Sequence, residues 1–201
     1  ILNHVSHLFA HYLRTFPDIH LSIIGGAFKG IKIYEALDKN TRPLKDLVKE
    51  SILNILEHSK DSKIILNNSL VLDLFAGTGS FGLECISRGA SKVYFIENND
   101  KSLEILNKNI KKLKCEKKAT IFKENVFSFF LNKKSQNEKL DLIFLDPPYK
   151  EKNINIILES IANLKLVKEN GLIVLHRHKK SEDNIDDKFA IKRSVKYGIS
   201  K

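Results

Sequence analysis

The alternation of strand-like and helix-like segments from residue 70 onward constrains the fold of this chain more than any other feature. Five short apolar runs are typical of buried strands: LVLDLFA (70–76), KVYFIE (92–97), ATIFKEN (119–125), LDLIFLD (140–146) and GLIVLHR (171–177). Four stretches between them have helical character: 80–89, 100–114, 126–134 and 153–167. Because parallel strands need long crossover connections, this order predicts an α/β fold with a mostly parallel sheet and helices on both faces.

The segments on either side of this alternation predict smaller additions. The stretch LSIIGGAFKGIKIYEAL (21–37) predicts a β-hairpin, because two short apolar runs flank Gly25-Gly26 and Gly30. Residues 38–59 predict a turn and a helix with this apolar stripe: Leu44, Leu47, Val48, Ile52, Ile55 and Leu56. The tail FAIKRSVKYG (189–198) predicts one more strand. We therefore divide the chain into an N-terminal extension of hairpin and helix (1–60) and the alternating domain (61–201).

A glycine-rich turn follows the first strand of the alternating domain. Gly77, Gly79 and Gly82 form a G-x-G-x-x-G pattern between a strand and a helix, which lets the backbone approach a nucleotide closely. Asp73 lies inside the strand end, where a buried carboxylate is costly without a partner. It would repel a phosphate, but it would favour a cationic ligand such as a sulfonium that carries an α-amino group. Asp73 therefore argues against NAD and for S-adenosylmethionine.

Polar side chains also end the next strands. Glu97 closes the second strand, where an acid can accept hydrogen bonds from ribose hydroxyls. Asn125 ends the third strand, where an amide can hydrogen-bond an adenine edge, although an ordinary turn also suits it. Ligands of open α/β sheets bind outside the carboxyl ends of the strands, so we expect these side chains to share one site.

The fourth strand ends in the turn DPPY. Asp146 follows an apolar run, and Pro147, Pro148 and Tyr149 come next. The prolines stiffen the turn, and Asp146 with a proline carbonyl could accept the two hydrogens of an exocyclic amine. This would align the nitrogen for attack on a methyl group, while Tyr149 could stack on the base.

These motifs, in this order, resemble the amino-group methyltransferases of the Rossmann class. The stretches IIGGAFKGIKI, TRPLKDLVKESILNIL, LDLFAGTGSFGLECISRGASKVYFIE and IFLDPPY are similar to one bacterial family, RsmD, over roughly residues 22 to 200. The resemblance implies a Rossmann-like class I methyltransferase fold, S-adenosylmethionine as the methyl donor and S-adenosylhomocysteine as the product. It also implies methylation of the exocyclic N2 amino group of a guanine in 16S rRNA, free or within an assembling small ribosomal subunit.

The resemblance also implies a set of site residues. The catalytic set is Asp146, Pro147, Pro148 and Tyr149. The cofactor-binding set is Asp73, Phe75, Ala76, Gly77, Gly79, Glu97, Asn98, Asn125 and Val126. Lys29, Lys32 and Arg42 are the expected RNA contacts. No metal is expected, because the two cysteines form no C-x-x-C motif.

Composition agrees with a nucleic-acid partner. A net charge of +10 favours polyanions. Apolar runs are too short to span a membrane, and two cysteines suit a reducing cytosol, so we expect a cytoplasmic monomer without membrane contact. A DNA adenine-N6 or protein-glutamine amino methyltransferase stays open as an alternative, since D/N-P-P-Y chemistry is similar there. A nucleotide-dependent oxidoreductase fits the glycine pattern alone, and a non-catalytic RNA-binding module fits the charge alone.

Overall fold

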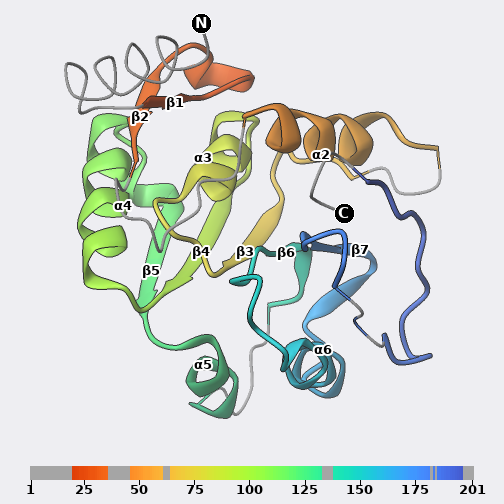
Figure 1. Ribbon diagram of the computed structural model, residues 1–201. Helices are drawn as coiled ribbons and strands as arrows, with labels where there is room; N and C mark the ends of the chain where they lie inside the picture. Colours follow the sequence, from red (N-terminus) through yellow and green to blue (C-terminus); the bar gives the residue numbers. More distant parts are fainter. Residues whose placement is uncertain are drawn as a thin grey trace, which may run out of the picture.

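A five-stranded parallel sheet forms the centre of the molecule (Figure 1). The computed structural model describes residues 20–35, 46–60, 64–132, 138–181, 183 and 185–196. The sheet has the order β5-β4-β3-β6-β7. Its strands are β3 (Leu70–Leu74), β4 (Lys92–Glu97), β5 (Ala119–Lys123), β6 (Leu140–Leu145) and β7 (Val167–Leu175). The chain runs outward from β3 to β5 and then returns to β6 on the other side of β3, so the strand order reverses between β3 and β6. Open α/β sheets bind their ligands at such a point.

Helices cover both faces of the sheet, as the sequence predicts. On one face pack α2 (Asp46–His58), α3 (Ser80–Ser87) and α4 (Asp100–Lys112); on the other pack α5 (Val126–Asn132) and α6 (Ile154–Asn163). Successive side chains of each strand point to opposite faces of the sheet. Val71 packs in the hydrophobic cluster under α2, α3 and α4, and Leu72 packs in a second cluster under α5 and α6. Both faces are therefore apolar, which explains why the strands lack a polar side.

The hairpin predicted near the N-terminus is present. β1 (His20–Ser22) and β2 (Lys32–Tyr34) pair antiparallel, and the 3-10 helix η1 (Gly26–Phe28) lies between them. Gly26 has a φ of +74°, and a Cβ there would lie 2.0 Å from the carbonyl oxygen of Ser87. Only glycine therefore lets the hairpin lie this close to the end of α3. A second 3-10 helix, η2 (Glu116–Lys118), precedes β5.

The predicted apolar stripe of α2 is partly wrong. Leu47 is 72% exposed, whereas Lys49 is fully buried together with Val48, Leu53 and Leu56. The helix is rotated from the apolar pattern because Lys49 finds polar partners in the interior. Leu44 lies outside the described residues, and the boundary at residue 60 stays a prediction.

The predicted strand at 189–198 is also wrong. The described part of it, residues 189–196, contains no strand, and Ile191 is 69% exposed. An alternating pattern does not make a strand when its apolar side chains have no surface to cover. β7, in contrast, begins at Val167, before the predicted start at Gly171. A register shift between Leu140 and Leu142 accommodates the longer strand.

Candidate active site

The acids predicted at the strand ends lie together at the reversal of strand order. Asp73 of β3 pairs in register with Phe95 of β4 and Phe144 of β6, so Glu97 at the end of β4 and Asp146 directly after β6 lie at the same edge of the sheet. The charges of Asp146 and Glu97 both act on the carboxyl of Asp73. The carboxyl ends of three neighbouring strands therefore form one acidic site.

Asp73 is the most deeply buried of these acids. It is 2% exposed, and its Oδ2 accepts a hydrogen bond from the backbone N–H of Gly82 at 3.0 Å. Burial raises the pKa of Asp73 well above its ordinary value; the Gly82 N–H lowers this pKa, and the charges of Asp146 and Glu97 raise it further. A positive charge placed beside this carboxyl would relieve that cost.

The glycine turn shows why each glycine is needed. Gly77 and Gly79 have positive φ angles of 57° and 85°. A Cβ on Gly79 would lie 2.4 Å from Leu106, and a Cβ on Gly82 would lie 2.3 Å from Phe95. Gly77 is different, because nothing lies within 4 Å of its Cβ position. The turn is therefore packed on its inner side and open at Gly77.

Glu97 ties the glycine turn to the end of β4. Its Oε2 accepts from the Gly77 N–H at 2.7 Å, and its Oε1 accepts from the N–H groups of Asn98 and Asn99 at 2.8 Å each. Ala76 lies in the same turn, where its N–H donates to the carbonyl of Ile96 at 3.0 Å. The ribose contact predicted for Glu97 stays a prediction; in the structure its carboxylate shapes the turn.

Three other residues are predicted from the sequence to bind the cofactor: Phe75 directly before the glycine turn, and Asn125 and Val126 at the start of α5. Phe75 adopts a φ of +61°, which is strained for a side chain of this size. Asn125 is exposed, and its Oδ1 accepts from the Phe127 N–H at 2.9 Å, so it caps the start of α5. Val126 is buried in the second hydrophobic cluster. The adenine contact predicted for Asn125 stays a prediction beside this capping role.

The DPPY turn follows β6 directly. Oδ1 of Asp146 lies 2.7 Å from Nδ1 of His176. Pro147 is buried and Pro148 exposed, and the carbonyl of Pro148 accepts from the N–H of Glu151 at 2.8 Å. Tyr149 is partly buried. The turn thus has a fixed backbone, and its acid is part of a hydrogen bond.

Three consecutive residues after β7 contact this turn, and the sequence analysis missed them. His176 contacts Asp146, as above. Arg177 donates from Nη1 to the Pro148 carbonyl at 3.3 Å, and the ring of His178 lies edge-on to that of Tyr149 with centroids 5.0 Å apart. The rule that ligand-binding residues follow strand ends covers these residues too, since they come directly after GLIVL (171–175). We call residues 176–178 the HRH segment.

The predicted RNA contacts lie on the hairpin. Lys29 and Lys32 are exposed, whereas Arg42 lies outside the described residues. Beside them, Nζ of Lys112 on α4 lies 4.4 Å from the ring centroid of Tyr34, which is 38% exposed. Asn109 of α4 holds the edge of β2 through both backbone groups of Tyr34, at 2.8 and 3.0 Å. The hairpin and the outer face of α4 therefore form one basic surface.

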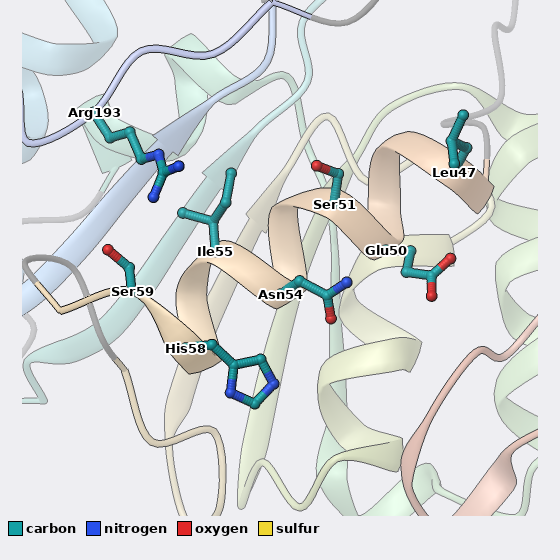
Figure 2. Close-up of a pocket in the computed structure, with 8 residues that line it drawn as sticks. All are labelled: Leu47, Glu50, Ser51, Asn54, Ile55, His58, Ser59 and Arg193. Atoms are coloured by element: carbon teal, nitrogen blue, oxygen red, sulfur yellow. The ribbon is translucent and has the colours of Figure 1, made fainter.

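One hollow on the described surface lies outside this site (Figure 2). It runs along the outer face of α2 and is closed on one side by Arg193 from the C-terminal tail. Its other lining residues include Glu50, Asn54 and His58. None of the predicted site residues contributes to it. Among the described residues no helix is both long and apolar enough to cross a bilayer, and no cluster of His, Cys, Asp or Glu suits a metal ion.

Comparison with known proteins identifies similar chains. The family model described as "Conserved hypothetical protein 95" matches residues 21–201. "Ribosomal RNA small subunit methyltransferase D" of Buchnera aphidicola (subsp. Acyrthosiphon pisum) is 35% identical over 158 residues, 79% of this chain and 78% of that protein. The protein with the same description from Haemophilus influenzae is 34% identical over 162 residues, 78% of each chain.

A solved structure has a similar fold. The protein yhhF from Escherichia coli superposes with a TM-score of 0.74 at 24% identity, over 90% of this chain and 94% of that one. This similarity agrees with the Rossmann-like class I fold predicted from the sequence.

Proposed function

Since the chain belongs to the family described as "Conserved hypothetical protein 95", the RsmD family, we propose that it methylates small-subunit ribosomal RNA. More specifically, we propose transfer of a methyl group from S-adenosylmethionine to the N2 amino group of a guanine in 16S rRNA. The observation that carries this proposal is the convergence of Asp73, Glu97 and Asp146 beside the open glycine turn.

The residues of the site fit this cofactor. Burial and two neighbouring acids disfavour the charge of Asp73, and no lysine or arginine among the described residues pairs with Asp73 or Glu97. A site of this kind favours a cation over an anion, which argues against a pyrophosphate ligand beside Asp73. When bound, S-adenosylmethionine supplies an electrophilic methyl group on a sulfonium. Asp73 and Glu97 would hold it, with Gly77 providing the close backbone approach.

The DPPY turn would hold the guanine amino group. The Pro148 carbonyl already accepts from Glu151 and Arg177, so Asp146 and the Pro147 carbonyl are the acceptors proposed for the two N–H groups. Holding both hydrogens aims the nitrogen lone pair at the methyl carbon. The sulfonium, held by Asp73 and Glu97, would supply the methyl group and keep the electron pair of its C–S bond, while the amine held by Asp146 and the Pro147 carbonyl would form the new N–C bond. The nitrogen then releases one proton to water.

The basic surface of hairpin and α4 would dock the RNA. Lys29, Lys32 and Lys112 are exposed there, and exposed lysines bind phosphates without reading sequence. Tyr34 offers a ring on which an unpaired base could stack. A guanine stacked inside a helix cannot present its amino group to the DPPY turn. We therefore propose that the target guanine is unpaired or flipped out of its stack when the RNA binds this surface.

Methyl transfer to isolated 16S rRNA and to small subunits tests the proposed function. The expected product, identified by mass spectrometry of the nucleosides, is N2-methylguanosine. N6-methyladenine in a DNA substrate, or a methylated glutamine in a protein substrate, would instead support the alternative amino methyltransferases. A folded protein that binds S-adenosylmethionine but makes no N2-methylguanosine in either RNA substrate would contradict the proposal.

Variants of the DPPY turn test its role. Asp146→Ala should reduce the single-turnover rate far more than the cofactor affinity, because the lost acceptor matters mainly in the transition state. Tyr149→Ala should weaken capture of the base by about 1–3 kcal/mol, and Tyr149→Phe should be milder because it keeps the ring. If Asp146→Ala folds and retains full activity, the mechanism is wrong.

A further inference from the structure

His176 lies against the acid of the DPPY turn and is almost completely buried. It is 6% exposed, and its Nδ1 lies 2.7 Å from Oδ1 of Asp146. The backbone fixes this contact, because the N–H of His176 donates to the carbonyl of Leu145 at 2.9 Å. His176 continues β7 and Asp146 continues β6, so the parallel pairing of Leu145 with Leu175 brings the two side chains together.

The two ring nitrogens of His176 have different surroundings. Nε2 is buried and has no hydrogen-bond partner among the described residues, whereas Nδ1 faces a carboxylate oxygen. A carboxylate accepts and does not donate, so Nδ1 carries the hydrogen in this pair. His176 thus uses one donor, and it engages only Oδ1 of Asp146. Oδ2 is left to accept from a substrate.

The neighbouring residues hold the rest of the turn. Nη2 of Arg177 donates to the carbonyl of Glu151 at 2.7 Å, and its Nε lies 3.1 Å from both carboxylate oxygens of Asp183. Arg177 is itself buried. Because Asp183 fixes the guanidinium, Arg177 can hold the backbone of the turn while His176 holds the side chain of its acid. The HRH segment therefore supports the turn at consecutive points.

We propose that His176 is a positioning residue for methyl transfer: its Nδ1–H fixes the rotamer of Asp146 so that Oδ2 accepts an N–H of the substrate amino group. This inference rests on the proposed function. His176 does not touch the substrate and takes no proton; it acts through Asp146. The role requires a single donor at the position of Nδ1, and Nε2 is dispensable.

Three substitutions separate this role from simple packing. His176→Asn places an amide N–H near the position of Nδ1, His176→Gln places it near Nε2, and His176→Ala removes both. We expect His176→Ala to lower the single-turnover rate about 10- to 100-fold, since small misplacements of a reacting group have effects of this size. His176→Asn should recover most of the rate and His176→Gln should not. The affinity for S-adenosylmethionine, measured by calorimetry, should stay within about twofold throughout.

A double variant and an exposed control complete the experiment. Once Asp146 is alanine, adding His176→Ala should lower the rate no further, because the two residues act as one unit. His58→Ala, an exposed histidine on α2, is the matched control and should keep the wild-type rate. Equal single-turnover rates for wild type and His176→Ala would overturn this inference. So would equal losses of rate in His176→Asn and His176→Ala that parallel their losses in melting temperature. Either result would leave the proposed function intact. A wild-type protein that methylates no RNA overturns the proposed function and this inference with it.

Discussion

Replacing Lys49 by methionine should destabilise the protein strongly, because its buried ammonium group has several polar partners. Its Nζ donates to the Ser22 carbonyl at 3.0 Å and to Ser80 Oγ at 3.1 Å, and it pairs with Asp46 at 3.2 Å and Glu84 at 3.7 Å. It thereby links the hairpin, α2 and the start of α3. The side chains of Lys49 and Glu84 are both fully buried.

The expected loss follows from these partners. Removing one member of a buried ion pair costs about 3–5 kcal/mol, because the other charge stays buried without compensation. In the variant the carboxylate of Glu84 would still accept hydrogen bonds from the N–H groups of Ile24 and Gly25 and from Arg88, so its charge would stay partly stabilised. The loss should therefore lie near the lower end, about 3 kcal/mol. With a urea dependence of about 2–3 kcal/mol per molar, the midpoint of unfolding should fall by about 1 M.

Urea unfolding followed by circular dichroism measures this shift, with Lys108→Met as the control. Lys108 pairs with Glu104 at 2.6 Å, a shorter distance than Lys49 to Glu84, but the side chains of Lys108 and Glu104 are both largely exposed. Water screens such a pair, so Lys108→Met should leave the midpoint unchanged. If the two variants shift the midpoint equally, burial does not determine the strength of these pairs and the reasoning fails.

Three further predictions concern charge. Asp73→Asn keeps an acceptor for the Gly82 N–H but loses the charge, so it should weaken S-adenosylmethionine binding by about 1.5–3 kcal/mol in calorimetry; unchanged affinity would remove Asp73 from the cofactor site. Burial and the charge of Asp46 raise the pKa of Glu35 to about 7 from an ordinary value of 4.5, despite an opposing effect of Lys49. The folded state therefore holds this proton more tightly than the unfolded chain, and the carboxyl reduces stability progressively as the pH rises from 4.5 to 7. Glu35→Gln should accordingly raise the urea midpoint at pH 8 but not at pH 4, and an equal gain at both values would contradict the shift. Lys29→Ala and Lys32→Ala should each lower the slope of log K for RNA against log salt by about 0.7–0.9, and a slope that does not change would exclude phosphate contacts.

The sequence by itself determined the sheet and the composition of the acidic site. Short runs dominated by apolar side chains form the strands of the sheet, and the helices between them force parallel connections. In a parallel sheet the carboxyl ends meet at one edge, so Asp73, Glu97 and Asp146 could be placed together without coordinates. Local geometry also set the glycine turn, because only glycine adopts the positive φ angles of Gly77 and Gly79 at little cost.

Only the tertiary structure showed which partners the polar side chains have in the folded protein. The sequence predicts that Asn125 ends a strand, but β5 ends at Lys123, and the side-chain oxygen of Asn125 caps α5. Lys49 interrupts an apolar pattern and would be placed on the surface from sequence, but Ser22, Ser80 and Glu84 meet it in the interior. These partners come from two other elements, β1 and α3, and no local pattern encodes their approach.

The contact of His176 with Asp146 depends most directly on tertiary structure. The two residues are 30 positions apart, and nothing near either one in the sequence indicates the other. They meet because β6 and β7 pair in a register that sets Leu145 opposite Leu175. Strand ends can be recognised from local composition, but the register between two strands is fixed by how their side chains pack across the sheet, and that packing involves the whole domain.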